Sequence, residues 1–445
     1  PEVSVWVKDG ASQLFAFEYG DFAGYLGVPT SDLILEVRTA DGLTTVASFV
    51  APLATLDLDG AALTVVASGF LNPANNSDGK PFGLFVATAA GGNLIALPAY
   101  VPMAKLQIIH NSADAAVEKV DIFVNGEEFL KDVGFRQATA FMDVPAGVDL
   151  NIVVAPAGAG IGNGVGPITV NLTENKNYIA IANGIVSATG YTPATAFSLD
   201  VFDMARLTAA DPANTDLLVF HGSTDAPEVS VWVKDGASQL FAFEYGDFAG
   251  YLGVPTSDLI LEVRTADGLT TVASFVAPLA TLDLDGAALT VVASGFLNPA
   301  NNSDGKPFGL FVATAAGGNL IALPAYVPMA KLQIIHNSAD AAVEKVDIFV
   351  NGEEFLKDVG FRQATAFMDV PAGVDLNIVV APAGAGIGNG VGPITVNLTE
   401  NKNYIAIANG IVSATGYTPA TAFSLDVFDM ARLTAADPAN TDLLV

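Results

Sequence analysis

The sequence contains no cysteine, and only 18 of its 445 residues are lysine or arginine. Without cysteine, disulfide bonds and thiolate metal sites are excluded, so each domain must be held together by its hydrophobic core alone. Against the 18 basic residues stand 47 acidic ones, and the formal net charge is −29 at pH 7. Nucleic acids and anionic membrane surfaces both require a basic protein face, so this composition argues against either as a partner.

Long apolar runs are also missing, because threonine, proline, aspartate or glycine interrupts every candidate before eighteen residues. We therefore predict no membrane insertion. Only 15% of the residues are charged while 51% are hydrophobic, against about a quarter charged in a typical domain. A chain this apolar is expected to bury surface between copies as well as within domains. Its strong acidity is typical of a saline or extracellular setting and also keeps a protein soluble.

A long internal repeat dominates what is present. Residues 1–219 and 227–445 are identical, so the period is 226 residues, and the segment FHGSTDA (220–226) occurs only once, between the two copies. Two interpretations fit this pattern: the chain is a segment of a longer array of repeats, or it is a subunit whose two ends complete each other. Identical stretches of this length favour a repetitive protein, because ordinary duplicates drift apart.

A weaker repeat lies inside the long one. The segment LLVFHGSTDAPEVSVWV (217–233) aligns with LQIIHNSADAAVEKVDIFV (106–124), and LTVVASGF (63–70) aligns with YIAIANGI (178–185). Each period thus holds two related units of usual domain size. We predict domains at 1–101, 102–213, 214–327 and 328–438, with 439–445 as the start of the next repeat or a donor tail. The first domain lacks the opening strand of the others.

The local pattern is one of short strands separated by tight turns. Segments such as VSVWV (3–7), LILEV (33–37) and KVDIFV (119–124) are rich in β-branched residues. Asp-Gly and Asn-Gly pairs between such segments supply the positive φ values of hairpin turns. About seven strands per domain predict an all-β chain of tandem Ig-like β-sandwiches, with less than about a tenth helix. The short linkers contain proline and behave as semi-rigid spacers, so we expect the domains to form a rod.

Each complete domain begins with one frame of residues: an apolar strand, then His-x-Ser-x-Asp-Ala, then an alternating strand ending at Asp-Gly or Asn-Gly. A Val-Pro pair follows the frame, in YLGVP (25–29) and FMDVPAG (141–147). Together, the frame and this pair resemble the bacterial cell-surface family catalogued as domain of unknown function 4397. The resemblance covers all four domains and implies Ig-like sandwiches in tandem on secreted or envelope proteins. The family carries no established catalytic residues, so it implies none here.

The histidines of this frame are the only ones in the chain: His110, His221 and His336. His221, Ser223 and Asp225 supply the three residue types of a hydrolase triad, but no oxyanion hole or nucleophile elbow accompanies them. The favoured interpretation is structural: serine and aspartate bond the backbone where the first strand turns into the second, and histidine packs at the rim. One imidazole per domain does not predict zinc.

Oxygen donors cluster in two loops, which raises calcium as an alternative to plain polar turns. Asn72, Asn75, Asn76 and Asp78 form one cluster, and Asp57 and Asp59 form the other. Neither cluster offers the six to eight ligands in a known loop that calcium prefers, so a polar hairpin loop is favoured and no cofactor is predicted. Asn75 and Asn171 are glycosylation sequons. The glycine-rich stretch 158–167 precedes no helix and is read as a loop rather than a phosphate cradle.

The first domain is expected to expose an apolar groove and an unpaired edge, because it lacks the LLVFH strand. We predict that the tail lies in this groove, against the strand Val3–Val7 of a neighbouring copy. The candidate assembly residues are Val3, Val5, Trp6, Val7, Leu443, Leu444 and Val445. The same reasoning predicts that Trp6 and Trp232 have different environments, since LLVFH would accompany Trp232 alone.

These features predict a structural protein rather than an enzyme: a self-associating subunit of a bacterial extracellular filament or surface fibre, assembled head to tail. The alternative is a passive stalk of a cell-surface adhesin. A secreted carbohydrate-active enzyme is a third class. It would present paired carboxylates in an aromatic cleft, whereas the two tryptophans here occupy the same strand position of their repeats.

Overall fold

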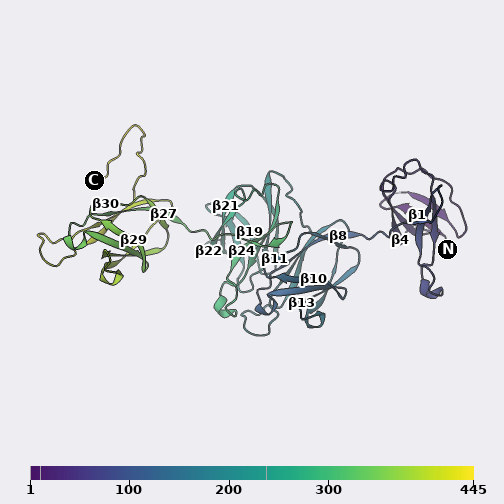
Figure 1. Cartoon of the computed structure of the whole chain (residues 1–445), viewed down its shortest axis with the longest axis horizontal. Helices are drawn as coiled ribbons and strands as arrows, with labels where there is room; N and C mark the ends of the chain where they lie inside the picture. The colour runs from purple at the N-terminus through teal and green to yellow at the C-terminus, as the bar shows by residue number, and fades with distance from the viewer. Residues whose placement is uncertain (1, 11, 237) are drawn as a thin grey trace. The chain divides into compact units, whose positions relative to one another are not determined.

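The computed structural model describes residues 2–10, 12–236 and 238–445 (Figure 1). Strands account for 49% of the chain and helical turns for 4%, which confirms the prediction of an all-β chain with little helix. Throughout the described ranges the helical part consists of three-residue 3-10 turns, at Pro73–Asn75, Ala115–Val117, Ile161–Asn163, Pro299–Asn301, Ala341–Val343 and Ile387–Asn389. The described residues contain no helix with the length and hydropathy of a membrane span.

The chain divides into two compact units, which we describe separately. The larger unit comprises Pro1–Val229, Phe241–Ser257 and Leu279–Ala322, and the smaller unit comprises Ser230–Leu240, Asp258–Pro278 and Leu323–Val445. The four predicted domain boundaries remain predictions, and the sandwiches below are named by their strands.

The first sandwich, in the larger unit, contains two antiparallel sheets with the orders β2-β1-β3-β4 and β5-β6-β7. Its core includes Val37, Phe49 and Val86. The strands are β1 (Val3–Val7), β2 (Gln13–Phe17), β3 (Leu33–Thr39), β4 (Thr45–Ala51), β5 (Thr64–Ser68), β6 (Gly83–Ala87) and β7 (Ile95–Ala96).

The second sandwich packs sheet β10-β9-β13-β14 against a sheet that contains β16-β15-β8-β11, with β12 also paired to β8. Its core includes Ile122, Ile152 and Leu172. The strands are β8 (Met103–His110), β9 (Lys119–Val124), β10 (Glu127–Gly134), β11 (Gln137–Ala138), β12 (Met142–Pro145), β13 (Asp149–Pro156), β14 (Val165–Asn171), β15 (Asn177–Asn183) and β16 (Ser198–Phe202).

The larger unit also holds a five-stranded sheet from the third predicted domain (214–327), with the order β20-β17-β23-β24-β26. We call it the partner sheet. Within it, strand β17 pairs antiparallel with β20 and parallel with β23. The strands are β17 (Asn214–His221), β20 (Phe248–Pro255), β23 (Ala288–Ser294), β24 (Gly309–Ala313), β25 (Gly318–Asn319) and β26 (Ile321–Ala322), of which β25 joins the second sandwich instead.

The smaller unit contains most of the sheet β19-β18-β21-β22 and the whole fourth sandwich. The fourth sandwich repeats the second: sheet β29-β28-β32-β33 packs against β30-β27-β34-β35 with β31, around Ile334, Ile348 and Leu398. The strands are β18 (Val229–Val233), β19 (Gln239–Phe243), β21 (Asp258–Thr265), β22 (Thr271–Pro278), β27 (Met329–His336), β28 (Lys345–Val350), β29 (Glu353–Gly360), β30 (Gln363–Ala364), β31 (Met368–Pro371), β32 (Asp375–Pro382), β33 (Val391–Asn397), β34 (Asn403–Asn409) and β35 (Ser424–Phe428).

The predicted pairing of an LLVFH strand beside Val3–Val7 is wrong. Both edges of β1 are already occupied, since Val5 lies opposite Phe15 on β2 and Val37 on β3. The LLVFH sequence forms β17, and β17 belongs to a different sheet from β18, the counterpart of β1. The segment between these consecutive strands carries the chain from one sheet to another, so their closeness in sequence does not make them neighbours.

The predicted difference between Trp6 and Trp232 is wrong for the same reason. Both indole rings are half-buried. The Trp6 N–H donates to Ser4 Oγ at 2.9 Å, and Arg38 lies 4.7 Å from the ring centroid. The corresponding distances around Trp232 are 3.0 Å and 4.7 Å. Each tryptophan lies in a sheet that β17 does not join, so the absence of an LLVFH strand leaves Trp6 unaffected.

Single variants Trp6→Phe and Trp232→Phe should therefore leave tryptophans with the same emission maximum, to within about 3 nm, and similar quenching by acrylamide. Both rings stack on an arginine and bond a serine, which fixes their solvent exposure. Steady-state fluorescence of the two variants provides the measurement. An emission maximum for Trp6 that is clearly red-shifted from that of Trp232 would contradict this equivalence.

Candidate assembly interface

One sheet of the second sandwich is apolar on both faces. Along β15, Tyr178 and Ala180 point into the sandwich core, whereas Ile179 and Ile181 point the opposite way and are 1% and 0% exposed. Successive side chains of a strand alternate between faces, so a strand buried at every position is covered from both sides. The second sandwich therefore packs through this sheet against another layer.

That layer is the partner sheet. Leu218 and Phe220 on β17 and Val292 on β23 lie in the same buried cluster as Ile179 and Ile181. Aromatic rings extend the contact at one end, where Phe248 lies 4.6 Å from Phe220 and 5.2 Å from Phe202 on β16, measured between ring centroids. This packing is a continuous hydrophobic core between two sandwiches, not a spacer between independent domains.

Backbone hydrogen bonds also join the two sandwiches. Strand β11 pairs antiparallel with β25, placing Gln137 opposite Asn319. The Leu320 N–H donates to the Arg136 carbonyl at 2.8 Å, and the Gln107 side chain donates to the Thr314 carbonyl at 2.8 Å. Main-chain pairing of this kind fixes the register of an interface more tightly than apolar contact alone.

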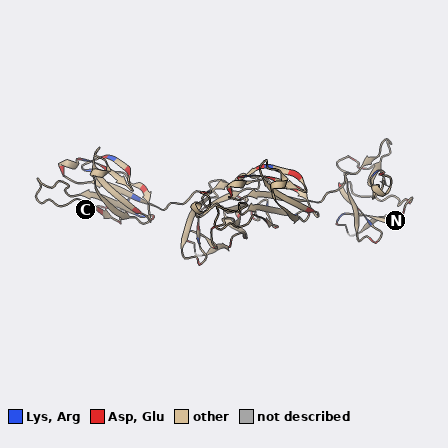
Figure 2. Cartoon of the chain, turned by 90° about the horizontal axis from the view of Figure 1, so that it is seen from below, with Lys and Arg blue, Asp and Glu red and all other residues tan. Residues whose placement is uncertain are grey.

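Arg136 reaches across the contact to several groups of the partner sheet. Its guanidinium donates to Ser294 Oγ at 3.0 Å and to the Pro307 carbonyl at 2.9 Å, and it stacks 3.7 Å from the centroid of the Phe311 ring. Burial lowers the pKa of Arg136 to about 10. These partners are uncharged, so they act as a hydrogen-bonding receptor for the arginine rather than as a salt bridge. Along the strands of the whole chain, acidic and basic residues are a minority (Figure 2).

The interface explains why the frame reads His-Gly-Ser in one repeat and His-Asn-Ser in the other. Asn111 donates to the Gly222 carbonyl at 3.1 Å and to Asn183 Oδ1 at 3.0 Å. A Cβ atom at position 222 would lie 2.0 Å from Nδ2 of Asn111, so glycine is the residue that admits the amide. Both motifs are recognisable in the sequence, but nothing in the sequence indicates that they face each other.

A second cluster involves the loop that was a calcium candidate. Tyr191 stacks on Phe296 with centroids 5.7 Å apart, and the Thr192 N–H donates to Asn302 Oδ1 at 2.9 Å. Asn302 is the counterpart of Asn76, and its side chain also donates to Asp225 at 3.0 Å. In the third repeat this asparagine therefore binds protein groups. Across the described residues, no group of three or more histidine, aspartate or glutamate side chains could hold a metal ion.

The His-x-Ser-x-Asp frame is structural, as favoured, though its partners lie farther along the chain than the neighbouring turn. Ser223 Oγ donates to the Gly295 carbonyl at 2.7 Å, and Asp225 accepts from the backbone of Leu297 at 2.8 Å. His221 Nε2 lies 3.0 Å from the Pro227 carbonyl, and burial lowers the pKa of this imidazole. The histidine is fully buried rather than at the rim.

Because the repeats are identical, the structure shows the same surfaces with and without a partner. In the fourth sandwich, the residues equivalent to Ile179 and Ile181 are only half-buried, and Asn337 and Asn409 are exposed. In the first sandwich, Val65 is 50% exposed against 3% for Val291. The β8/β15 half of the observed interface therefore recurs as an uncovered surface on the fourth sandwich, and the β23/β24 part of the other half recurs, without β17, on the first sandwich.

The first sandwich also differs from the partner sheet in its strands. Residues 22–29 form no strand, although the identical sequence forms β20 beside β17. Phe22 is 94% exposed and Tyr25 is 84% exposed. Within the described ranges, no strand occupies the position of β17 between residues 22–29 and β5, so this is where the unpaired edge lies.

The tail keeps the local structure that leads into β17. Arg432 forms an ion pair with Asp442, as Arg206 does with Asp216 at the start of β17. Beyond it, the predicted assembly residues Leu443, Leu444 and Val445 are exposed. Their counterparts Leu217, Leu218 and Val219 are buried in the partner sheet. Whether the tail residues or Val3, Val5, Trp6 and Val7 take part in assembly stays a prediction.

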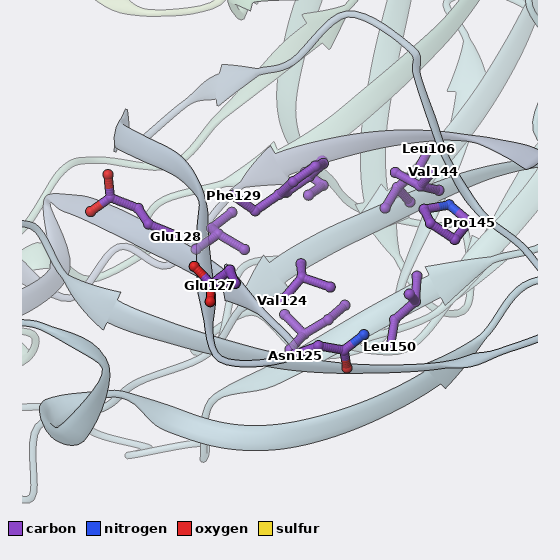
Figure 3. Close-up of a pocket in the computed structure, with 12 residues that line it drawn as sticks. Leu106, Val124, Asn125, Glu127, Glu128, Phe129, Val144, Pro145 and Leu150 are labelled. Carbon is purple, nitrogen blue, oxygen red and sulfur yellow. The ribbon is translucent and has the colours of Figure 1, made fainter. Parts of the chain in front are cut away.

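An apolar cavity of about 230 Å³ lies at the edge of the second sandwich, under β10 (Figure 3). Leu106, Val124 and Leu150 line it, and Glu127 and Glu128 belong to the same lining. None of its lining residues is among the interface residues described above.

A family profile matches residues 104–232 and 330–439, which is more than half of the chain, and its family is described as "Domain of unknown function (DUF4397)". The chain belongs to this family. The first match runs from the second sandwich through β17 into β18, so it crosses the interface described above.

Among solved structures, the Bacillus anthracis TIE protein is similar over 92% of this chain, with 10% identity and a TM-score of 0.17. The chain spans 65% of that protein, which is less than two thirds of its length. No curated protein matches the chain.

Replacing Arg136 with glutamine should destabilise the contact between the second sandwich and the partner sheet by about 1.5–3 kcal/mol, the range for hydrogen bonds to charged groups. Arg362→Gln is the matched control, because Arg362 has the same sequence context but is exposed. Denaturant unfolding of each variant and of the wild type, followed by far-ultraviolet circular dichroism, gives both free energies. Equal effects of the two substitutions would refute a special role for Arg136.

The interface should also strengthen as the pH falls from neutral towards 4. Burial raises the pKa of Asp200 on β16 from its ordinary value of 3.8, so its charged form opposes packing above that value and protonation relieves the cost. Asp200→Asn should raise the free energy of unfolding of the second sandwich and partner sheet at pH 7. The difference from the wild type should shrink as the pH falls towards 3.8. Asp426→Asn, at the exposed equivalent, is the control. An advantage that persists unchanged at low pH would contradict this.

Proposed function

We propose that the chain is a structural subunit of an extracellular filament or surface fibre, assembled head to tail from repeated β-sandwich domains. The observation that carries this proposal is the interface between the second sandwich and the partner sheet, because its β8/β15 face recurs uncovered on the fourth sandwich and its β23/β24 face recurs, without β17, on the first. Self-association is thus the proposed activity, in a bacterial extracellular setting and without catalysis.

The two uncovered surfaces differ from each other, which determines the kind of assembly. The fourth sandwich carries the β8/β15 type of face, and the first carries the β23/β24 type. A contact between unlike surfaces is heterologous, and a heterologous contact that does not close into a ring produces an open filament. Linear growth is therefore the form of self-association that these surfaces support.

Strand completion between copies or repeats is the second part of the proposal. In the partner sheet, β17 fills the position between β20 and β23 and buries Leu217, Leu218 and Phe220. Each fully buried side chain of this size contributes roughly 1.5–3 kcal/mol. A strand of the β17 type would pair with β5 and order residues 22–29 as the missing edge strand. In this proposal the joint forms at β5 and residues 22–29 rather than at Val3–Val7.

A passive adhesin stalk is the alternative function. It is favoured by the continuous chain between the second and third repeats, where the Arg206–Asp216 ion pair and the buried Ala205 hold the linker against the interface. A stalk would use the same sandwiches within one long chain. Electron microscopy distinguishes the two functions, since a subunit forms fibres from separate chains and a stalk fragment does not.

If the tail completes the first sandwich of the next copy, Leu444→Asp should abolish fibres, because its counterpart Leu218 is fully buried. The sandwiches themselves should remain folded, since Leu444 is exposed in the single chain. Ala439→Asp is the matched control: it adds the same charge where the counterpart Ala213 is exposed, and it should leave fibres intact. Negative-stain electron microscopy and sedimentation are the measurements. Normal fibres from Leu444→Asp would rule out completion by the tail.

A further inference from the structure

We propose that the fourth sandwich docks through sheet β30-β27-β34-β35 onto the β5-β6-β7 sheet of a second copy of this chain, reproducing the contact between the second sandwich and the partner sheet. This inference rests on the proposed function and specifies which faces meet. The occupant of the exposed fourth face is thus the first sandwich of another copy.

The exposed face of the fourth sandwich carries the same polar groups that the second sandwich uses to contact the partner sheet, and they already have the same arrangement. Asn337 donates to Asn409 at 3.1 Å, as Asn111 does to Asn183 at 3.0 Å. Arg362 stacks on Phe361 at 4.8 Å, close to the 4.7 Å between Arg136 and Phe135. A side chain held in its bound arrangement before docking loses less conformational entropy when the contact forms.

The first sandwich offers the matching receptor. The Phe82 N–H bonds the Phe70 carbonyl at 2.9 Å, so the loop that presents the Pro81 carbonyl has the same backbone as in the partner sheet, where the equivalent bond is 2.8 Å. Phe70 is 45% exposed against 1% for Phe296, and Leu94 is 45% exposed against 8% for Leu320. These side chains are the ones that a docked sandwich covers.

The choice of a second copy over another partner follows from continuity with the internal interface. Each group on this face of the fourth sandwich has an identical counterpart in the second sandwich, whose partners are visible in the larger unit. The partners on β23, on β24 and in the adjoining loops have identical counterparts on the first sandwich, and Leu217, Leu218 and Val219 have theirs in the tail at 443–445, whereas Phe220 and Gly222 have none. Apolar contact and backbone pairing dominate the internal contact, so the chain's net charge of −29 opposes docking only weakly at physiological salt.

Engineered cysteines test this docking, since the chain has none of its own. Gln137 and Asn319 lie opposite each other in the β11–β25 pair, and directly opposed Cα atoms of antiparallel strands are about 4.5–5.5 Å apart, within disulfide range. Their counterparts at the proposed joint are Gln363 and Asn93. The double variant Gln363→Cys/Asn93→Cys should form disulfide-linked oligomers under mild oxidation, at least tenfold more abundant than those of the control Gln363→Cys/Leu43→Cys.

A second double variant, Gln137→Cys/Asn319→Cys, provides the reference, because it should form its disulfide within a single chain. A ladder of oligomers from Gln363→Cys/Asn93→Cys on non-reducing gels supports the docking. Fibres visible by electron microscopy but with no more disulfide ladder than the control overturn the docking and leave the proposed function standing. Absence of both fibres and ladder overturns the docking and the proposed function together.

Discussion

Burial of both faces of the β8/β15 sheet is the constraint on which the rest of the structure depends. A sandwich needs only one apolar face per sheet, so Ile109, Ile179 and Ile181 add a second apolar face that the sandwich cannot cover by itself. Water-exposed apolar patches of this kind favour association. In the larger unit the partner sheet covers that face, so the second sandwich and the partner sheet share one hydrophobic core.

Polar groups make this association selective. Arg136 bonds only uncharged acceptors, and Asn111 reaches a carbonyl that glycine leaves accessible. Burying such groups is costly unless each finds its partner, so a sheet with apolar residues but the wrong acceptors is a poor substitute. By contrast, the contact between the first and second sandwiches centres on Glu174, which binds Lys8 and the Tyr100 hydroxyl. The two types of junction therefore differ in both chemistry and extent.

The sequence predicted the fold well and the interface poorly, for physical reasons. Turn residues such as Asp9 and Asn125 do adopt positive φ, and these local requirements are readable from residue type. The apolar pattern of 177–182 indicated a strand, but it did not show that the second face was covered by residues about forty positions farther along the chain. The pairing of LLVFH with VSVWV was inferred from their adjacency, whereas consecutive strands of a sandwich often belong to different sheets. Non-local sheet order leaves no local signal.

Hydrogen–deuterium exchange of the segment ALTVVASGF tests most directly whether assembly completes the first sandwich. The segment occurs at 62–70, with an open edge, and identically at 288–296, where β17 protects it. Peptides from both sites have the same mass, so a dispersed chain should give two isotope envelopes of equal size. In assembled fibres, completion of the first sandwich should remove the fast-exchanging envelope and leave one protected population. Two equal envelopes that persist in fibres would contradict it.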